Sequence, residues 1–260
     1  MTEDSESPRP AVLHTPDGAQ IAYHHTPGRL PGVVFMGGFA SDMTGTKAVA
    51  LESFVRQRGN AFVRFDYQGH GQSSGHFRDG TIGQWSRDAV HVLDALAEGP
   101  QVLVGSSMGG WIMLLAALAR PAHAAGMLGI AAAPDFTEDM LWAGFDAATR
   151  ERIERDGVHE MPSDYGAPLP ITRDLIHEGR SHLLMRGSIP LTCPVRLIQG
   201  MQDDEVPWDW ALKLTERLQS EDVEAVLIKH GDHRLSDGPD LDRLRYQLDR
   251  LLGHVEGVAT

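Results

Sequence analysis

The chain has 260 residues, 42% of them hydrophobic, so it can bury a sizeable core, and α/β folds with one continuous sheet often reach this length. Its formal net charge of −13 argues against a nucleic acid or an anionic membrane surface as a partner, because both carry negative charge. The only cysteine, Cys193, excludes an internal disulfide and a cysteine-based zinc site.

The first ten residues, MTEDSESPRP, are acidic and polar, unlike a secretory signal or an arginine-rich transit peptide. No run of 18 apolar residues occurs, so the sequence predicts no membrane span. We therefore expect a cytoplasmic protein with a loose tail over residues 1–10.

Apolar runs alternate with helical patterns along most of the chain. Asp17-Gly18 predicts a hairpin between two short strands within 11–25. Such alternation is typical of an α/β fold, here a mostly parallel eight-stranded sheet flanked by helices. Further strands are predicted at 32–38, 61–67, 101–107, 127–133, 195–200 and 225–230, and helices at 46–58, 83–97, 111–119, 208–219 and 239–252.

Residues 135–190 interrupt this alternation, with charged helical pieces mixed among four prolines. The interruption falls between the sixth and seventh predicted strands. We expect it to form a small cap above the sheet, inserted into a single domain that covers 11–260.

A candidate nucleophile lies between an apolar strand and an apolar helix. The motif is Gly105-Ser106-Ser107-Met108-Gly109, which matches G-x-S-x-G. In that context the pattern predicts a tight strand-to-helix turn that presents Ser107, with the helix N-terminus facing any negative charge that develops. The alternative without catalytic function is a flexible surface loop that contains serines by chance.

A serine hydroxyl needs a base to remove its proton, and the base needs an orienting acid. When a strand-turn-helix serine of this kind is the nucleophile, the acid and then the histidine follow it in the chain. The loop after 195–200 offers Asp203, Asp204 and Glu205, of which Asp203 comes first off the strand and is favoured as the acid. Asp204 and Glu205 are interpreted as solvated loop charges. His233, on the loop after 225–230, is the predicted base, and His230 is assigned a structural role.

Two backbone N–H groups are expected to hold the oxyanion, one from Met108 and one from Phe39, which follows Gly37-Gly38. The Phe39 ring also predicts a pocket wall. Trp111 is a candidate substrate contact near the acyl pocket, although core packing is its simpler interpretation.

Other chemistries lack residues to support them. No dinucleotide or P-loop motif stands at a strand–helix junction, so no nucleotide cofactor is expected. His230 and His233 have no third partner at suitable spacing, so no metal site is expected. Cys193 precedes a proline and is interpreted as a packing residue at the start of a strand.

Several stretches together resemble the α/β-hydrolase-domain-containing enzymes, and most of all their branch of mitochondrial palmitoyl-protein thioesterases, which also hydrolyse acyl glucuronides. The resemblance implies a serine nucleophile at Ser107, an acid at Asp203, a base at His233 and a cap over an acyl-binding cleft. Two departures stand out: Gly37 replaces the family's usual histidine, and the N-terminus lacks a mitochondrial transit sequence. The similar stretches are 37–48, 64–75, 99–121, 193–208 and 229–235.

The sequence thus predicts a serine hydrolase that cleaves carboxylic esters or acyl thioesters, with S-acylated proteins and acyl glucuronides among the candidate substrates. Two alternatives stay open. A carbon–carbon bond hydrolase can use the same three residues, and a non-catalytic binding protein can keep the same fold.

Overall fold

The computed structural model describes residues 9–163 and 167–258, so residues 1–8 of the expected tail lie outside the described part. Its main sheet contains β1 (Ala11–His14), β2 (Gln20–Thr26), β3 (Arg29–Met36), β4 (Asn60–Phe65), β5 (Gln101–Ser106), β6 (Ala124–Ile130), β9 (Val195–Gly200) and β10 (Val223–Ile228). Their order is β1-β2-β4-β3-β5-β6-β9-β10. β2 pairs antiparallel with both β1 and β4, and every other pair is parallel. The predicted mostly parallel eight-stranded sheet is confirmed.

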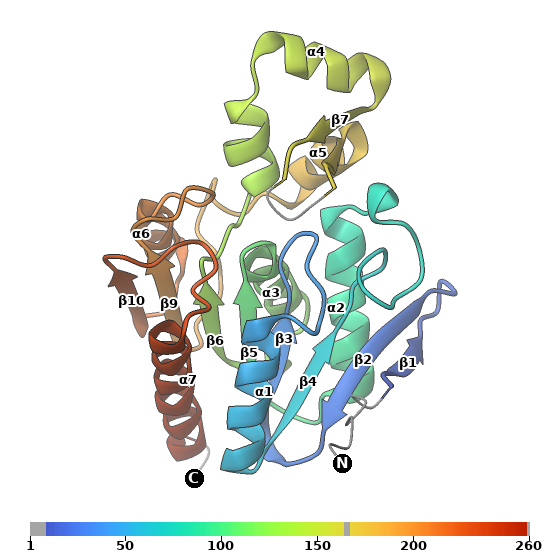
Figure 1. Ribbon diagram of the computed structural model, residues 1–260. Helices are drawn as coiled ribbons and strands as arrows, with labels where there is room; N and C mark the ends of the chain where they lie inside the picture. The colour runs from blue at the N-terminus through green and yellow to red at the C-terminus, as the bar shows by residue number, and fades with distance from the viewer. Residues whose placement is uncertain (1–8, 164–166, 259–260) are drawn as a thin grey trace, which may run out of the picture.

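Helices cover both faces of this sheet (Figure 1). The helices that pack on the sheet are α1 (Thr46–Arg58), α2 (Ile82–Leu96), α3 (Met108–Ala119), α6 (Asp209–Arg217) and α7 (Gly238–Val258). Two short 3-10 turns, η1 (Phe77–Asp79) and η2 (Pro121–His123), lie in the connections between these elements. One apolar cluster joins one face of the sheet to α1 and α7, and a second joins the other face to α2, α3 and α6. Because both faces are covered, the interior strands β5 and β9 are buried along their whole length.

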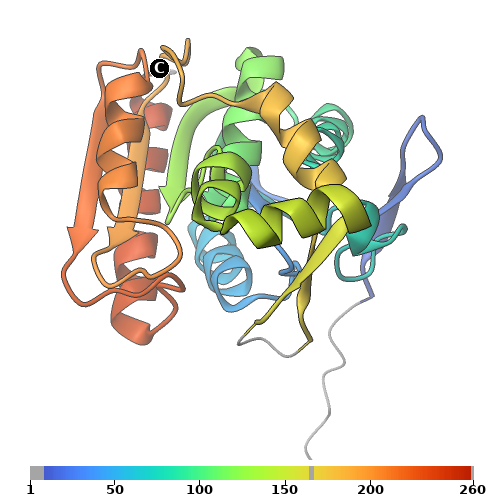
Figure 2. The same cartoon turned by 90° about the horizontal axis from the view of Figure 1, so that it is seen from above.

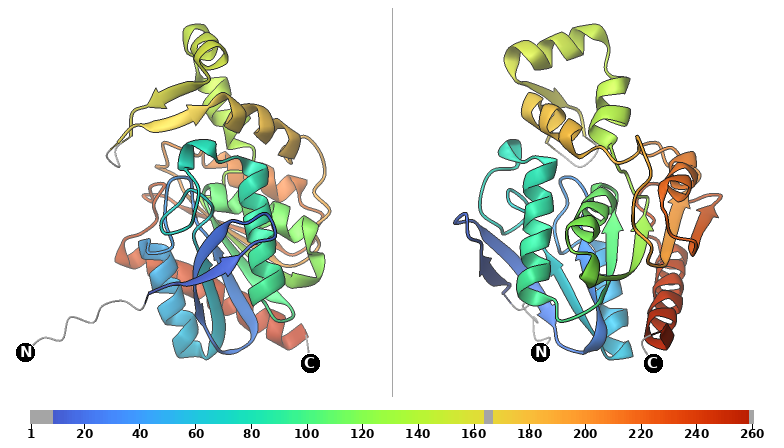
Figure 3. Two further views of the ribbon diagram at one scale, coloured as in Figure 1. Left: turned by 90° about the vertical axis from the view of Figure 1, so that its right-hand side faces the viewer. Right: turned by 180° about the vertical axis from the view of Figure 1, so that it is seen from behind.

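The chain between β6 and β9 leaves the sheet and lies above the ends of its parallel strands (Figure 1, Figure 2). This cap contains the π-helical segment η3 (Thr137–Trp142), α4 (Ala147–Asp156), β7 (Val158–Met161), β8 (Leu169–Thr172), α5 (Arg173–Gly179) and the 3-10 turn η4 (Arg180–His182). β7 and β8 form an antiparallel pair of their own, which the sequence did not predict. Figure 3 shows α4 as the part of the cap that lies farthest from the sheet.

A buried carboxylate joins the two ends of the cap. Asp135 is fully buried, and its two carboxylate oxygens each accept a 2.8 Å hydrogen bond from a backbone N–H, those of Leu184 and Met185. Burial raises the pKa of Asp135, although the two N–H groups act in the opposite direction. The cap therefore leaves and rejoins the domain at one point, beside the end of β6.

None of the described helices is long and apolar enough to cross a membrane.

Candidate active site

Ser107 occupies a strained turn between the end of β5 and the start of α3. Its φ of 55° and ψ of −122° are rarely adopted by a non-glycine residue. The glycines of the motif permit close approach: a Cβ at Gly105 would lie 2.3 Å from the carbonyl oxygen of Gly109, and one at Gly109 would lie 2.1 Å from that of Met36. The start of α3 is thereby held against the end of β3, with the serine hydroxyl at the cavity.

Three residues that are far apart in sequence meet at this turn. His233 lies with Nε2 3.0 Å from Oγ of Ser107 and with Nδ1 2.8 Å from Oδ2 of Asp203. The imidazole is largely buried, with 14% of its side chain exposed, and the Asp203 side chain is fully buried. The structure thus brings together the predicted nucleophile, base and acid at hydrogen-bond distances that suit proton transfer.

The surroundings of Asp203 keep it ionised. Its Oδ1 accepts the backbone N–H groups of Glu205 and Val206 at 2.9 and 2.8 Å, and its Oδ2 accepts the Gln199 side-chain amide at 2.7 Å. Burial raises the pKa of Asp203, but hydrogen bonding to His233 and these backbone N–H groups outweigh it, so the pKa lies below its usual value. Gln199 was not identified from the sequence, although a polar residue directly after the apolar pair Leu197-Ile198, near the end of a strand, was a usable signal.

The two competing carboxylates lie differently. Asp204 is exposed, as expected for a solvated loop residue. Glu205 is half exposed, yet its Oε2 lies 3.4 Å from Nε2 of His233 and it lines the cavity beside Ser107. Its interpretation as a simple solvated charge was therefore incomplete, because a carboxylate at this distance stabilises an imidazolium.

The two predicted oxyanion donors flank the nucleophile. Met108 is the first residue of α3, and Phe39 lies on the loop after β3; both line the cavity with Ser107. Among the described residues, neither backbone N–H has a hydrogen-bond acceptor. Both amides are thus free to bind an oxygen that carries negative charge.

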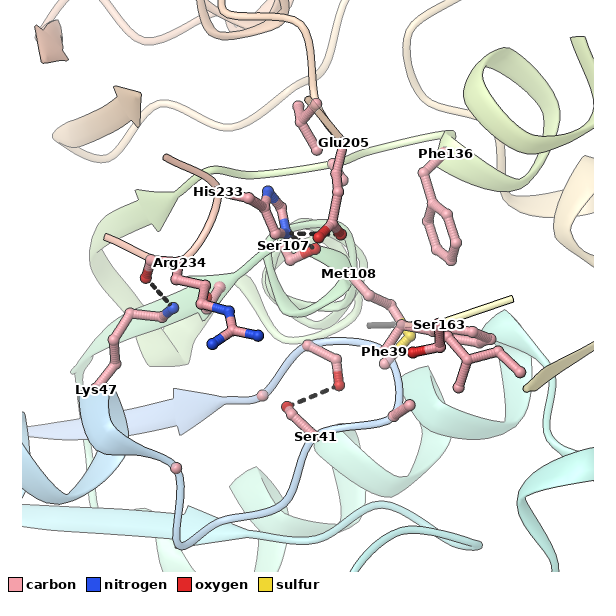
Figure 4. A pocket seen from close by; sticks show the side chains of 18 of the residues that line it. Phe39, Ser41, Lys47, Ser107, Met108, Phe136, Ser163, Glu205, His233 and Arg234 are labelled. Atoms are coloured by element: carbon pink, nitrogen blue, oxygen red, sulfur yellow. Dashed lines mark hydrogen bonds and ion pairs between the residues drawn. The ribbon is translucent and has the colours of Figure 1, made fainter. Parts of the chain in front are cut away.

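A cavity of about 630 Å³ opens at Ser107 beneath the cap. Its apolar lining includes Phe39, Met108, Phe136, Met140, Leu141 and Leu169. Its charged lining includes Asp42, Lys47, Glu205 and Arg234. Figure 4 shows Phe39 and Phe136 to one side of Ser107, and Lys47 and Arg234 to the other. Burial lowers the pKa of Lys47 to about 8. The cavity therefore suits a molecule with one apolar and one polar part.

Trp111 differs from its expected place at the substrate. It is fully buried and is not among the residues that line the cavity. Its indole donates a 3.0 Å hydrogen bond to the carbonyl of His182, and its ring lies edge-on to Phe136, 6.0 Å between centroids. Trp111 thus supports the cavity wall from behind, because a residue at this turn of α3 points into the core.

Two further side chains were assigned structural roles. His230 is exposed on a turn after β10, which ends two residues before the predicted strand end. Burial raises the pKa of the Cys193 thiol to about 11, which makes it a poor nucleophile, and it packs against the core as expected. No group of three or more His, Cys, Asp or Glu side chains within 9–163 and 167–258 is arranged to hold a metal ion.

Known proteins resemble this chain over nearly its whole length. A family model described as serine aminopeptidase, S33, matches residues 31–154. Palmitoyl-protein thioesterase ABHD10, mitochondrial, of Pongo abelii is 41% identical over 250 residues, which cover 95% of this chain and 81% of that protein. The solved structure of mouse alpha/beta hydrolase domain-containing protein 10 matches with a TM-score of 0.88 at 40% identity and covers 95% of this chain and 99% of that one. A structure from Agrobacterium vitis S4 matches with a TM-score of 0.89, also at 40% identity, and covers 95% of this chain and 98% of that one.

These relatives correct one expectation. The proteins from Pongo abelii, Bos taurus, Homo sapiens, Mus musculus and Rattus norvegicus are all named as mitochondrial, so the expectation of a cytoplasmic protein is wrong. The expected fold and family are both confirmed. The chain belongs to the α/β-hydrolase family of serine hydrolases, in the branch that contains palmitoyl-protein thioesterase ABHD10.

Proposed function

We propose that Ser107, His233 and Asp203 form the catalytic triad of an ester and thioester hydrolase. The observation that carries this proposal is the position of the His233 ring, which joins Oγ of Ser107 at 3.0 Å to Oδ2 of Asp203 at 2.8 Å. The neighbouring serine of the motif, Ser106, is instead buried at the end of β5.

The reaction runs in two halves. His233 removes the proton from Ser107, whose Oγ attacks the acyl carbonyl, and the N–H groups of Phe39 and Met108 hold the oxyanion. His233 then gives that proton to the departing thiol or alcohol, which leaves the acyl group on Ser107. Water, activated by the same imidazole, attacks this acyl-enzyme; the C–O bond to Ser107 breaks, and the serine regains its proton.

Two carboxylates support the imidazole during these steps. Asp203 accepts from Nδ1 and holds the tautomer in which Nε2 can take the serine proton. Glu205 lies 3.4 Å from Nε2 and adds negative charge at the side where the leaving group departs. Both charges favour the imidazolium that forms transiently.

We propose acyl thioesters and carboxylic esters with a polar leaving group as the substrates. The apolar side of the cavity, under residues 135–190 acting as the cap, accommodates the acyl chain, and the charged side accommodates the leaving group. S-acylated proteins and acyl glucuronides both combine an apolar acyl chain with a polar leaving group. The related ABHD10 enzymes are named as palmitoyl-protein thioesterases.

A hydrolysis panel tests this assignment. Purified protein is assayed with acyl thioesters and p-nitrophenyl esters of increasing chain length, and with an acyl glucuronide. We expect hydrolysis to extend to long acyl chains. Leu141→Trp, which fills the apolar side, should lower the rate on long chains much more than on acetyl esters. Leu212→Trp, at an exposed position on α6, is the matched control. A preference confined to short esters in the unsubstituted protein would contradict a depalmitoylating role.

A further inference from the structure

We propose that Ser41 is a positioning residue, which fixes the direction of the Phe39 N–H through the carbonyl of Gly38. This inference rests on the proposed function, in which the Phe39 N–H binds the oxyanion. Ser41 carries no role in the triad, and nothing in the G-x-S-x-G motif points to it.

The geometry begins with one peptide group. The carbonyl oxygen of Gly38 accepts two hydrogen bonds from Ser41, one from Oγ at 3.0 Å and one from the backbone N–H at 3.2 Å. Figure 4 draws the bond from Oγ. The C=O of Gly38 and the N–H of Phe39 belong to the same planar trans peptide, so they point in opposite directions. Whatever fixes the carbonyl therefore fixes the N–H.

This peptide lies against the nucleophile. A Cβ built on Gly38 would lie 3.4 Å from Cβ of Ser107, so the loop contacts the turn that carries the hydroxyl. On the other side of the peptide, the Phe39 ring contacts Phe77 and Trp85 edge-on, with centroids 4.8 and 5.8 Å apart. These ring contacts anchor the Phe39 side chain. They do not fix the rotation of the Gly38–Phe39 peptide plane, which is set by the hydrogen bonds to the Gly38 carbonyl.

The loop needs this restraint because its backbone is strained next to Ser41. Ala40 has a φ of 57°, a left-handed conformation that disfavours residues with a Cβ. The hydroxyl of Ser41 adds a second bond to a turn that is otherwise closed by the single 3.2 Å backbone bond. A carbonyl that accepts hydrogen bonds also polarises its own peptide, which strengthens the N–H as a donor.

The test uses Ser41→Ala with Ser41→Thr, which keeps the hydroxyl. We expect Ser41→Ala to lower kcat about 10-fold with KM unchanged, a fraction of the roughly 10²- to 10³-fold loss that follows removal of a whole oxyanion donor. The Ki of an alkyl boronic acid, which forms a tetrahedral adduct with Ser107, should rise by the same factor. Ser41→Thr should restore both values. Thr44→Ala removes a nearby hydroxyl that contacts Asp42 instead, and should change neither.

Two results would overturn the inference: an unchanged kcat in Ser41→Ala, with or without a rise in KM, or a fall in kcat without weaker boronate binding. Thermal melting of each variant separates these results from loss of folded protein. The proposed function fails separately, if Ser107→Ala retains activity. An inactive Ser107→Ala beside an unaffected Ser41→Ala would remove only the role of Ser41.

Discussion

The side-chain amide of Gln199 donates a 2.7 Å hydrogen bond to Oδ2 of Asp203, the same oxygen that lies 2.8 Å from Nδ1 of His233. Gln199 is almost fully buried in β9, four residues before the carboxylate that it contacts. The strand therefore supplies a donor that holds the proposed acid in place, and the loop after the strand supplies the acid itself.

Replacing Gln199 should impair catalysis through Asp203, although Gln199 does not line the cavity. Gln199→Leu removes one hydrogen bond to a charged group, an interaction of about 1.5–3 kcal/mol, so kcat/KM should fall about 10- to 100-fold. Gln199→Glu sets a second carboxylate against Asp203 and should reduce the rate further. Steady-state kinetics, with melting curves as the folding control, measure both. Full activity in the folded Gln199→Leu variant would show that Asp203 needs no such support.

The competing loop carboxylates can be separated by isosteric changes. Asp203→Asn should lower kcat about 10⁴-fold, because the amide favours the wrong tautomer of His233. Asp204→Asn changes an exposed neighbour and should leave kcat close to that of the original protein. If the two variants lose activity equally, the assignment of Asp203 as the acid, which rests on its contact with His233, is wrong.

The strands and the nucleophile turn were predictable because their signals are local. Gly105, Ser107 and Gly109 mark the turn because their spacing falls between an apolar strand and an apolar helix, and apolar runs mark β5 and β6. The role of the Met108 N–H as an oxyanion donor was predictable from the same turn, because Met108 directly follows Ser107 in the chain. His233 and Asp203 were predictable as well, because the carboxyl ends of parallel strands meet at one edge of the sheet.

Long-range contacts had no signal of this kind. The bond from Gln199 to Asp203, the approach of Glu205 to His233 and the placing of Trp111 behind Phe136 depend on side-chain directions that spacing does not encode. The β7–β8 pair escaped prediction because its strands are short and carry proline and charge. Asp135 joins segments almost fifty residues apart, so its role appears only in the folded chain.

The junction of the cap should be sensitive to Asp135. Asp135→Ala leaves the buried N–H of Met185 and the partly buried N–H of Leu184 without an acceptor. It also places an alanine at a φ of 62°, where alanine is less tolerated than aspartate. We expect a loss of about 2–3 kcal/mol in the free energy of unfolding. Asp135→Asn keeps one acceptor oxygen and tolerates the left-handed backbone, so its loss should be smaller. Urea unfolding measures both, and equal stability of Asp135→Ala and the unsubstituted protein would contradict the role of this residue.

A second carboxylate gives a pH-dependent contribution to stability. Glu256 on α7 accepts hydrogen bonds from both terminal nitrogens of Arg58 at 2.6 and 3.0 Å, and this pairing, partly offset by burial, lowers its pKa from 4.5 to about 2. A carboxylate whose pKa is lower in the folded than in the unfolded chain stabilises the folded state at every pH above its unfolded pKa of 4.5. That stabilisation is lost as the pH falls from 4.5 towards 2.

Glu256→Gln should therefore cost about 1 kcal/mol at pH 7, the discounted value for a partly exposed pair. The difference from the unsubstituted protein should narrow as the pH falls from about 4.5 to about 3, which denaturant titrations at several pH values can follow. Glu216→Gln, at an exposed position on α6, is the control. A difference that grows on acidification would mean that the ionised form of Glu256 does not stabilise the folded state.

Covalent labelling with a fluorophosphonate, followed by mass spectrometry of the labelled peptide, tests the central claim most directly. The convergence of Ser107, His233 and Asp203 predicts a single adduct on Ser107, lost in Ser107→Ala, strongly slowed in His233→Asn, and retained in Ser106→Ala. An adduct on another residue, or undiminished labelling of Ser107 when the imidazole is absent, would contradict the proposed triad.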